Sequence, residues 1–233
     1  MFNIIIYGER IDYIKKNIKD MKIDYQIYNF SGLNNELDSL IRKKELNKIY
    51  LLNVDKIGIG IALRIRENDN NSIIIFISQC ECYQKQIFDN KLMAFDFVCR
   101  DNLYEERVVN DILLAIKIIA NNKMFVFKYN HVIYRIPYSQ INYIEKEPLI
   151  KRCIIHATSD DYYVINSIND LINKLSYGFI RTHQSCIVNV NNINSINLSN
   201  NIITFRNGDK TNLLVDRVKK EVINYIELID NNC

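Results

Sequence analysis

The chain has 233 residues, of which 48% are hydrophobic, and a formal net charge of +3 from 30 Lys and Arg against 27 Asp and Glu. This length and composition are typical of two ordinary globular domains, and so small a net charge gives no bulk-charge argument for nucleic-acid binding. No stretch approaches the length of a membrane span, and the first residues lack a basic segment followed by a long apolar run. We therefore expect a soluble, cytoplasmic protein.

The cysteines do not follow the spacing of a zinc finger or ribbon. Six are present, at positions 80, 82, 99, 153, 186 and 233. Cys80-Glu-Cys82 alone offers too few ligands for zinc. We therefore expect six reduced thiols, with no metal and no cofactor.

The first half of the sequence alternates short apolar runs with apolar residues at helical spacing. The expected strands are Phe2–Tyr7, Asp24–Phe30, Lys48–Val54, Ser72–Ser78 and Phe95–Arg100. The expected helices are a first one with apolar residues from Ile11 to Met21, then Leu33–Lys44, Ile59–Glu67, Gln84–Lys91 and Leu103–Ala120. Five strand–helix units predict a doubly wound α/β domain, flavodoxin-like, with a parallel sheet covered by helices on both faces.

Ligands of such a sheet bind at the carboxyl ends of its strands. The order of elements, the strand ends Leu51-Leu-Asn53 and Phe76-Ile-Ser78, and the run Phe95-Asp-Phe-Val-Cys-Arg100 together resemble the receiver domain of bacterial response regulators. The resemblance implies an acidic, Mg²⁺-binding pocket in which an aspartate after the third strand takes a phosphoryl group. It also implies a Ser or Thr after the fourth strand and a lysine after the fifth.

At these positions the chain has Glu9, Asn53, Ser78 and Arg100. An amide cannot replace the carboxylate nucleophile, and one carboxylate beside Arg10 is a poor site for Mg²⁺. We therefore predict a degenerate phosphorylation pocket in which Glu9 and Arg100 form a salt bridge and Ser78 is a surface hydroxyl. The alternative is phosphorylation of a non-standard acceptor such as Asp55, which lies two residues past Asn53.

The second half predicts a mainly antiparallel β domain. The expected strands are 124–129, 131–136, 141–145, 153–158, 162–165, 179–182, 186–190, 193–198, 202–206 and 211–215. Asn207-Gly-Asp209 is a hairpin signal, Ile168–Leu175 is a helix with Ser167 as a candidate cap, and Val218–Ile229 is a closing helix. The predicted division is 1–120, a linker at 121–123, and 124–233.

The stretch Phe179-Ile-Arg-Thr-His-Gln-Ser-Cys-Ile-Val-Asn-Val-Asn191 begins and ends with apolar residues but is polar from Arg181 to Ser185. Buried, each polar group would need a partner, so we expect this segment to be lifted to the surface. Together with Ile193-Asn-Ser-Ile196 and Val215-Asp-Arg-Val-Lys-Lys220, the stretch resembles the LytTR DNA-binding domain. Two-domain regulators of the accessory-gene-regulator and toxin-gene-regulator type share the whole layout.

The resemblance implies that loops, rather than a recognition helix, enter successive major grooves. The residues that match the contacting loops are Lys151, Arg152, His183, Gln184, Ser185 and Arg217. Arg and Lys can donate to guanine, Gln can bond adenine twice, and His or Ser can reach phosphate. From the residues alone, an ordinary solvated side chain is the favoured reading for each of them. His131 and His156 have no acid or metal partner at a useful spacing, and Tyr143, Tyr162, Tyr163 and Asn189 are expected to be structural.

We therefore predict a sequence-specific, DNA-binding transcription regulator, independent of aspartyl phosphorylation and not an enzyme. The alternatives are a phosphorylation-controlled response regulator that uses Asp55, and an enzyme on the α/β half. The enzyme is disfavoured because the crevice lacks a Gly-rich phosphate loop, a nucleophile with a base and paired carboxylates. The expected partners are double-stranded promoter DNA, a second copy of the chain on that DNA, and RNA polymerase, with no membrane.

Overall fold

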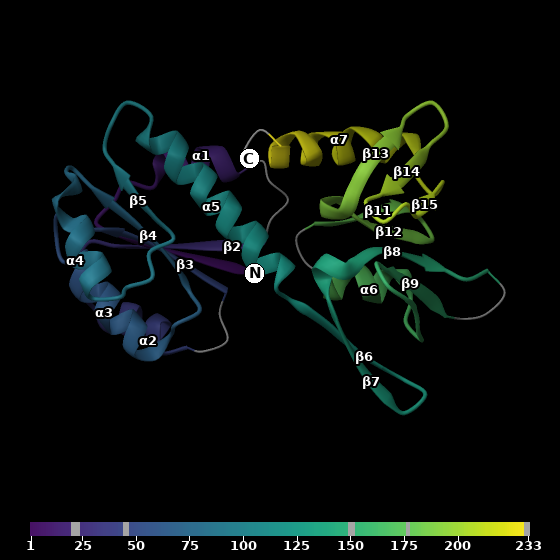
Figure 1. Ribbon diagram of the computed structural model, residues 1–233, viewed down its shortest axis with the longest axis horizontal. Helices are drawn as coiled ribbons and strands as arrows, with labels where there is room; N and C mark the ends of the chain where they lie inside the picture. Colours follow the sequence, from purple (N-terminus) through teal and green to yellow (C-terminus); the bar gives the residue numbers. More distant parts are fainter. Residues whose placement is uncertain (20–23, 44–46, 149–151, 176–177, 231–233) are drawn as a thin grey trace. The chain divides into compact units, whose positions relative to one another are not determined.

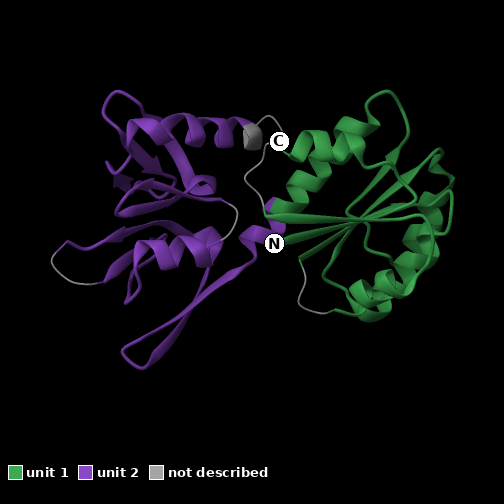
Figure 2. Cartoon of the chain, turned by 180° about the vertical axis from the view of Figure 1, so that it is seen from behind, with its two compact units in different colours: residues 1–116 green, residues 117–233 purple. Residues whose placement is uncertain are grey.

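The computed structural model describes residues 1–19, 24–43, 47–148, 152–175 and 178–230. It divides into two compact units, residues 1–116 and 117–233 (Figure 2). The division lies within helix α5 (Tyr104–Asn121), and β6 begins at Met124. The predicted domain limits, with a linker at 121–123 between residues 1–120 and 124–233, stay a prediction.

Unit 1 is a five-stranded parallel sheet in the order β2-β1-β3-β4-β5, which confirms the doubly wound α/β fold (Figure 1). Its strands are β1 (Phe2–Tyr7), β2 (Tyr25–Phe30), β3 (Asn47–Asn53), β4 (Ile73–Ser78) and β5 (Asp96–Cys99). Its helices are α1 (Asp12–Ile18), α2 (Asn35–Arg42), α3 (Gly58–Asn68), the 3₁₀ turn η1 (Glu81–Tyr83), α4 (Gln84–Asp89) and α5.

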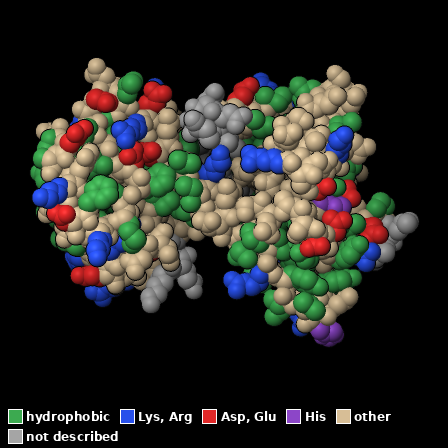
Figure 3. All heavy atoms as spheres, in the orientation of Figure 1, with side chains coloured by type: hydrophobic (Ala, Val, Ile, Leu, Met, Phe, Trp, Pro, Cys, Tyr) green, Lys and Arg blue, Asp and Glu red, His purple; other side chains and the backbone are tan. Residues whose placement is uncertain are grey.

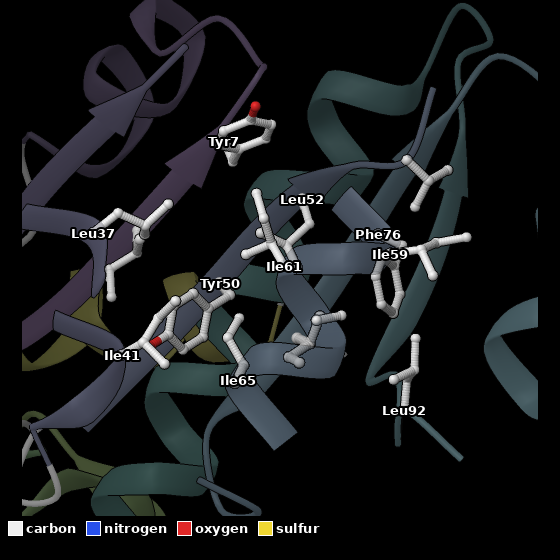
Figure 4. Packing of buried hydrophobic residues seen from close by; sticks show 14 of the residues in the cluster. Tyr7, Leu37, Ile41, Tyr50, Leu52, Ile59, Ile61, Ile65, Phe76 and Leu92 are labelled. Carbon is white, nitrogen blue, oxygen red and sulfur yellow. The ribbon is translucent and has the colours of Figure 1, made fainter. Parts of the chain in front are cut away.

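Side chains of the central strands alternate between two buried faces, so both faces of the sheet need covering. One face packs its Tyr50, Leu52 and Phe76 against α2, α3 and α4. In Figure 4, Tyr50 lies toward Ile41 of α2 and Ile65 of α3. All of these side chains are at most 3% exposed. This packing fixes the strand ends at which the receiver-like pocket lies.

A charged network is buried at the opposite ends of the strands. The Lys48 side chain is fully buried, its Nζ lying 3.1 Å from Asp69 Oδ2 and 3.0 Å from the Ile41 carbonyl oxygen. Asp69 also accepts hydrogen bonds from the backbone N–H groups of Asn71 and Ser72. These bonds and Lys48 hold the pKa of Asp69 below its ordinary value despite the opposing effect of burial.

Unit 2 is mainly antiparallel β, as expected. A five-stranded sheet has the order β10-β9-β8-β12-β11, a three-stranded sheet the order β13-β14-β15, and β6 and β7 form a hairpin. The strands are β6 (Met124–Tyr129), β7 (Val132–Pro137), β8 (Ile141–Lys146), β9 (Cys153–Ala157), β10 (Asp161–Val164), β11 (Phe179–His183), β12 (Cys186–Asn189), β13 (Ile193–Asn197), β14 (Ile202–Phe205) and β15 (Lys210–Thr211). The helices are α6 (Ile168–Lys174), α7 (Asp216–Asp230) and the 3₁₀ turns η2 (Tyr138–Gln140) and η3 (Val190–Asn192).

The five-stranded sheet of unit 2 has a separate core on each face. On one face Ile144, Ile155 and Ile187 pack with the β6–β7 hairpin and α6. On the other, Val188 packs with β14 and α7, where Phe205 is 1% exposed. The expected cap of α6 is confirmed, because Ser167 forms a reciprocal capping box with Asp170.

Several element boundaries differ from the sequence prediction, and three of them have a clear local reason. The strand expected from His131 begins at Val132, because Asn130 and His131 have φ angles of 48° and 65° and form the hairpin turn. The strand expected over 211–215 ends at Thr211, whose hydroxyl accepts from the Leu213 N–H as the chain turns. Asn34 caps α2 by accepting from the Leu37 N–H, so that helix begins later than Leu33.

The expectation of six reduced cysteines is wrong for one pair, because Cys80 and Cys82 are joined by a disulfide. Their Cα atoms are 5.4 Å apart, within the range a disulfide spans. Cys99, Cys153 and Cys186 are free thiols, and Cys233 lies outside the described residues. Among the described helices, none is both long and apolar enough to cross a membrane.

Candidate nucleic-acid interface and receiver-like pocket

The candidate DNA-contacting residues come from segments that backbone hydrogen bonds draw together at one end of the unit 2 sheet. The Lys146 N–H, at the end of β8, donates to the Ser185 carbonyl oxygen at 2.8 Å. The Val215 N–H, just before α7, donates to the Thr182 carbonyl oxygen at 3.0 Å. The β11–β12 turn therefore lies between the end of β8 and the residue that precedes α7.

His183 and Ser185 close the β11–β12 turn on itself. His183 Nδ1 lies 2.6 Å from Ser185 Oγ and accepts the Ser185 N–H at 3.2 Å. Accepting a backbone N–H requires Nδ1 to be unprotonated, which in the neutral ring leaves the proton on Nε2. Ser185 thus orients the imidazole, and Nε2–H is the donor left for a ligand.

Arg181 clamps the same turn from the side. Its Nη2 donates to the Gln184 carbonyl oxygen at 2.7 Å, its Nε to the His183 carbonyl oxygen at 3.3 Å, and its Nη1 to Asn169 Oδ1 at 2.7 Å. Sequence reasoning did not single out this residue. The signal was present, since an exposed Arg two residues before a turn can reach that turn's carbonyl oxygens.

The polar stretch from Arg181 to Ser185 is only partly at the surface. Arg181 and Gln184 are exposed, but Thr182 is fully buried, so the expectation that the whole segment is lifted out is wrong for Thr182. The reason is the alternation of a strand, which turns Thr182 inward between its exposed neighbours. Burial likewise raises the pKa of the adjacent Cys186 thiol to about 12 and keeps it uncharged.

Arg152 is bound into the surface of its own unit. Its Nε donates to Glu147 Oε2 at 2.6 Å and its Nη1 approaches the Tyr129 hydroxyl oxygen at 3.5 Å, while the guanidinium lies 4.1 Å from the ring centroid of Tyr163. The hydrogen bond to Glu147 raises its pKa. Of its end nitrogens, Nη2 is left for a ligand, so bidentate guanine recognition would require Arg152 to rearrange.

Arg217 and Gln184 are better placed to reach a ligand. Both are exposed, and Arg217, in the first turn of α7, makes no hydrogen bond or ion pair with another described residue. Gln184 is held through its carbonyl oxygen, which leaves its side-chain amide at the tip of the turn. Lys151 lies outside the described residues. Base contact by any of these residues stays a prediction.

The expectation that His156 lacks an acidic partner is wrong. Its Nδ1 lies 2.8 Å from Asp161 Oδ1 and its Nε2 lies 3.2 Å from Glu145 Oε1. The carboxylates come from β10 and β8, which flank β9, so cross-strand pairing brings together residues that sequence spacing separates. The ring also stacks on Tyr143, at 4.1 Å between centroids, and is structural.

In unit 1, Glu9 and Arg100 pair as predicted. The Glu9 carboxylate is 1% exposed, forms an ion pair with Arg100 through Oε2, and lies 3.4 Å from Arg100 Nη1 through Oε1. Asn53 donates to the Gly8 carbonyl oxygen at 3.0 Å and accepts the Asp55 N–H at 3.0 Å. The ends of β1, β3 and β5 are thus tied together by protein groups.

Ser78 is not the surface hydroxyl that we expected, because it is fully buried. Its Oγ donates to Asp55 Oδ1 at 2.7 Å, and the Gln79 N–H donates to Asp55 Oδ2 at 2.9 Å. Asp55 itself is exposed. The loop after β3 folds back over β4, so the Asp55 carboxylate covers the hydroxyl.

The Mg²⁺ that a receiver-like fold implies does not fit these residues. Both Glu9 oxygens face Arg100, Oε1 also accepts the Arg10 N–H, and Asn53 carries no charge. Among the described residues there is no group of three or more His, Cys, Asp or Glu side chains that could hold a metal. Hard dications need several anionic oxygens, and here a guanidinium takes their place.

The charged side chains give no further guidance to a binding face. On the face drawn in Figure 3, Lys and Arg side chains are scattered among acidic and neutral ones. Residues 124–233 hold 12 basic and 10 acidic residues, a difference of +2. Any contact with DNA therefore depends on a few placed cations rather than a broad basic field.

Residues 131–226 match the family model of the LytTr DNA-binding domain. A relative, accessory gene regulator protein A of Staphylococcus epidermidis, is 28% identical over 201 residues, which cover 80% of this chain and 84% of the relative. The chain is therefore similar to two-domain LytTR response regulators. The match to the DNA-binding domain lies in its second unit, which supports a role in DNA-binding transcription regulation.

Two solved structures are each similar to about half of this chain. A LytTr domain of a Bacillus cereus response regulator is 22% identical and covers 46% of this chain and 95% of that one, with a TM-score of 0.36. A receiver domain from Bacteroides fragilis is 15% identical and covers 49% of this chain and 96% of that one, with a TM-score of 0.37.

Proposed function

We propose that this chain is a LytTR regulator that binds promoter DNA with sequence preference and without control by aspartyl phosphorylation. The independence from phosphorylation is supported by the pairing of Glu9 with Arg100 beside Asn53. Phosphorylation of a receiver adds charge to a carboxylate that a dication compensates. Here the residue after the third strand is an amide, and the remaining buried carboxylate is neutralised by an arginine.

In the proposed DNA complex the β11–β12 turn makes the central contact. His183 donates through Nε2 to a phosphate oxygen, and Gln184 presents its amide to a base edge, where adenine offers a matching donor and acceptor. Arg217 reads a guanine from the start of α7, and Lys151 and Ser185 make further contacts with the DNA. Arg152, held by Glu147 and Tyr163, contacts phosphate through Nη2.

The test is incubation with acetyl phosphate and Mg²⁺, followed by mass spectrometry and measurement of DNA affinity. We expect an unchanged mass and an unchanged Kd, because no acceptor of the usual kind is present. The protein's level, its self-association or a partner that docks on unit 1 would then set its activity.

The alternative acceptor, Asp55, has one observation in its favour. Its carboxylate lies against Ser78, at the end of β4, close to where a receiver holds its phosphoryl group. Against it, both oxygens already accept hydrogen bonds, from Ser78 and from the Gln79 N–H. A gain of one phosphoryl mass that Asp55→Asn abolishes, together with tighter DNA binding, would establish this alternative and overturn the proposal.

We further propose that two copies bind neighbouring half-sites and that the complex contacts RNA polymerase. Helix α5 supports self-association, because Leu114 and Ile118, four residues apart on one helix face, are each 37% exposed. Sedimentation of the protein with duplexes that carry one or two half-sites tests the stoichiometry. One copy on the two-site duplex at saturation would contradict the dimer.

A further inference from the structure

A cavity in unit 1 lies beside the receiver-like pocket. Its volume is about 300 Å³, and its lining is Gly8, Glu9, Arg10, Asn29, Phe30, Ser31, Lys56 and Arg100. These residues lie in the last positions of β2 or just after β1, β2, β3 and β5, at the carboxyl ends of the parallel strands. Glu9 and Arg100 of the receiver-like pocket form part of its wall, whereas Asp55 and Ser78 are not in the lining.

The cavity lies next to the point where the strand order reverses. In the order β2-β1-β3-β4-β5, β2 lies on one side of β1, and β3 and the later strands lie on the other side. Open α/β sheets bind ligands in the crevice at such a reversal. Gly8, directly after β1, has a φ of 72°. A Cβ built there would lie 3.0 Å from Lys56 Cδ, so the glycine lets the Lys56 side chain lie across the end of β1.

The charges of the lining do not cancel. Three cations, Arg10, Lys56 and Arg100, face one anion, Glu9, which is already paired with Arg100. Lys56 is exposed and makes no ion pair with another described residue. Arg10 lies 3.6 Å from Glu105, but their side chains are 73% and 45% exposed, and an ion pair so exposed contributes little.

We propose that this cavity is a binding site for a small dianion, a phosphate group either free or as a monoester. Lys56 and Arg10 supply the two cations, and Ser31 and Asn29 supply neutral hydrogen-bonding groups on the β2 side. Phe30, 6% exposed, gives an apolar wall against which the rest of a monoester packs. The proposal goes beyond the proposed function, since it needs no covalent step and no metal.

The test is titration of the full chain with inorganic phosphate at constant ionic strength, followed by calorimetry and by the amide resonances of unit 1. A parallel titration with adenosine monophosphate separates free phosphate from a monoester, and acetate serves as the monoanion. We expect saturable phosphate or monophosphate binding that shifts the Gly8 and Ser31 amides, with acetate at least about tenfold weaker because it leaves one cation unpaired. Lys56→Gln and Arg10→Gln should each weaken binding about tenfold, the loss expected for one charge-assisted hydrogen bond.

Lys85→Gln is the matched control, because Lys85 is an exposed lysine of α4 outside the lining. Binding that Lys85→Gln weakens as much as Lys56→Gln would show non-specific attraction and overturn the site. Absence of saturation with both phosphate probes, or acetate binding of equal strength, would overturn it as well. The amide shifts of the unmodified chain keep the proposal testable if a variant misfolds. Because none of these readouts depends on acetyl phosphate or DNA, the site and the proposed function fail separately.

Discussion

Replacing Arg181 by lysine tests whether the β11–β12 turn is pre-organised for DNA. Lysine keeps the positive charge but loses the planar fork that reaches three acceptors at once. In the structure these acceptors are the carbonyl oxygens of His183 and Gln184 and the side-chain oxygen of Asn169. The substitution therefore changes the order of the turn while leaving the net charge alone.

The size of the effect follows from the ordering that the clamp supplies. Fixing one residue's backbone costs about 1–2 kcal/mol, and the clamp holds two of them. The bonds from Lys146 to Ser185 and from Ser185 to His183 remain and retain part of that order. We expect specific DNA affinity to fall by about 1–2 kcal/mol, a factor of roughly 5–30 in Kd. Because Arg181 is exposed, the free energy of unfolding should change by less than about 1 kcal/mol.

Fluorescence anisotropy at one fixed salt concentration measures the effect, with a labelled target duplex and a random duplex of equal length. Arg135→Lys is the control, because Arg135 is an exposed arginine of β7 in the same unit. If Arg181→Lys binds like the unmodified protein while Arg181→Ala loses affinity equally for both duplexes, Arg181 acts as a phosphate contact and the reasoning is refuted.

Three further predictions concern single side chains. Arg217→Ala should lower specific affinity by roughly 1–3 kcal/mol in the same assay if it reads a guanine, and an unchanged Kd would remove it from the interface. Gln184→Ala should change the preferred bases in a selection from random duplexes more than it changes total affinity; an equal loss on all sequences would make it a backbone contact. Burial and the nearby Asp96 raise the pKa of Asp111 from 3.8 to about 7, although Arg107 opposes the shift. Its proton therefore stabilises the fold fully below about pH 4, and this contribution is lost as pH rises to about 7. After allowance for solvent screening, Asp111→Asn should raise stability at pH 8 by about 1 kcal/mol and flatten the dependence of the urea midpoint on pH between 5 and 8, and a midpoint with unchanged pH dependence would contradict this assignment.

The sequence was sufficient for the order of elements because each strand and helix of unit 1 carries its own periodicity. Phe2–Tyr7 is apolar except for Asn3 and is a fully buried interior strand, and Ser167 followed by Asp170 is a local capping signal. What failed depends on pairing between distant residues. His156 meets its two acids across neighbouring strands, and Ser78 is covered by a loop that follows a different strand.

The candidate sites show the same limit. The Glu9–Arg100 pair could be predicted because parallel strands bring their carboxyl ends to one edge. The sequence could not predict which cations remain available to a ligand, because this depends on whether a neighbouring side chain contacts them. Arg152 is engaged by Glu147 and Tyr163, whereas Arg217 is exposed and makes no such contact with a described residue.

The buried pair of Lys48 and Asp69 makes the order of mutations matter. If Asp69 is replaced first, the fully buried ammonium keeps only the Ile41 carbonyl oxygen, and such an uncompensated charge costs about 3–5 kcal/mol, a large part of a domain's stability. If Lys48 is replaced first by a residue such as methionine, Asp69 still accepts two backbone N–H groups and is 13% exposed. The cost of replacing the pair therefore depends on which residue is replaced first. We expect a lineage that exchanges this pair for apolar residues to lose Lys48 before Asp69.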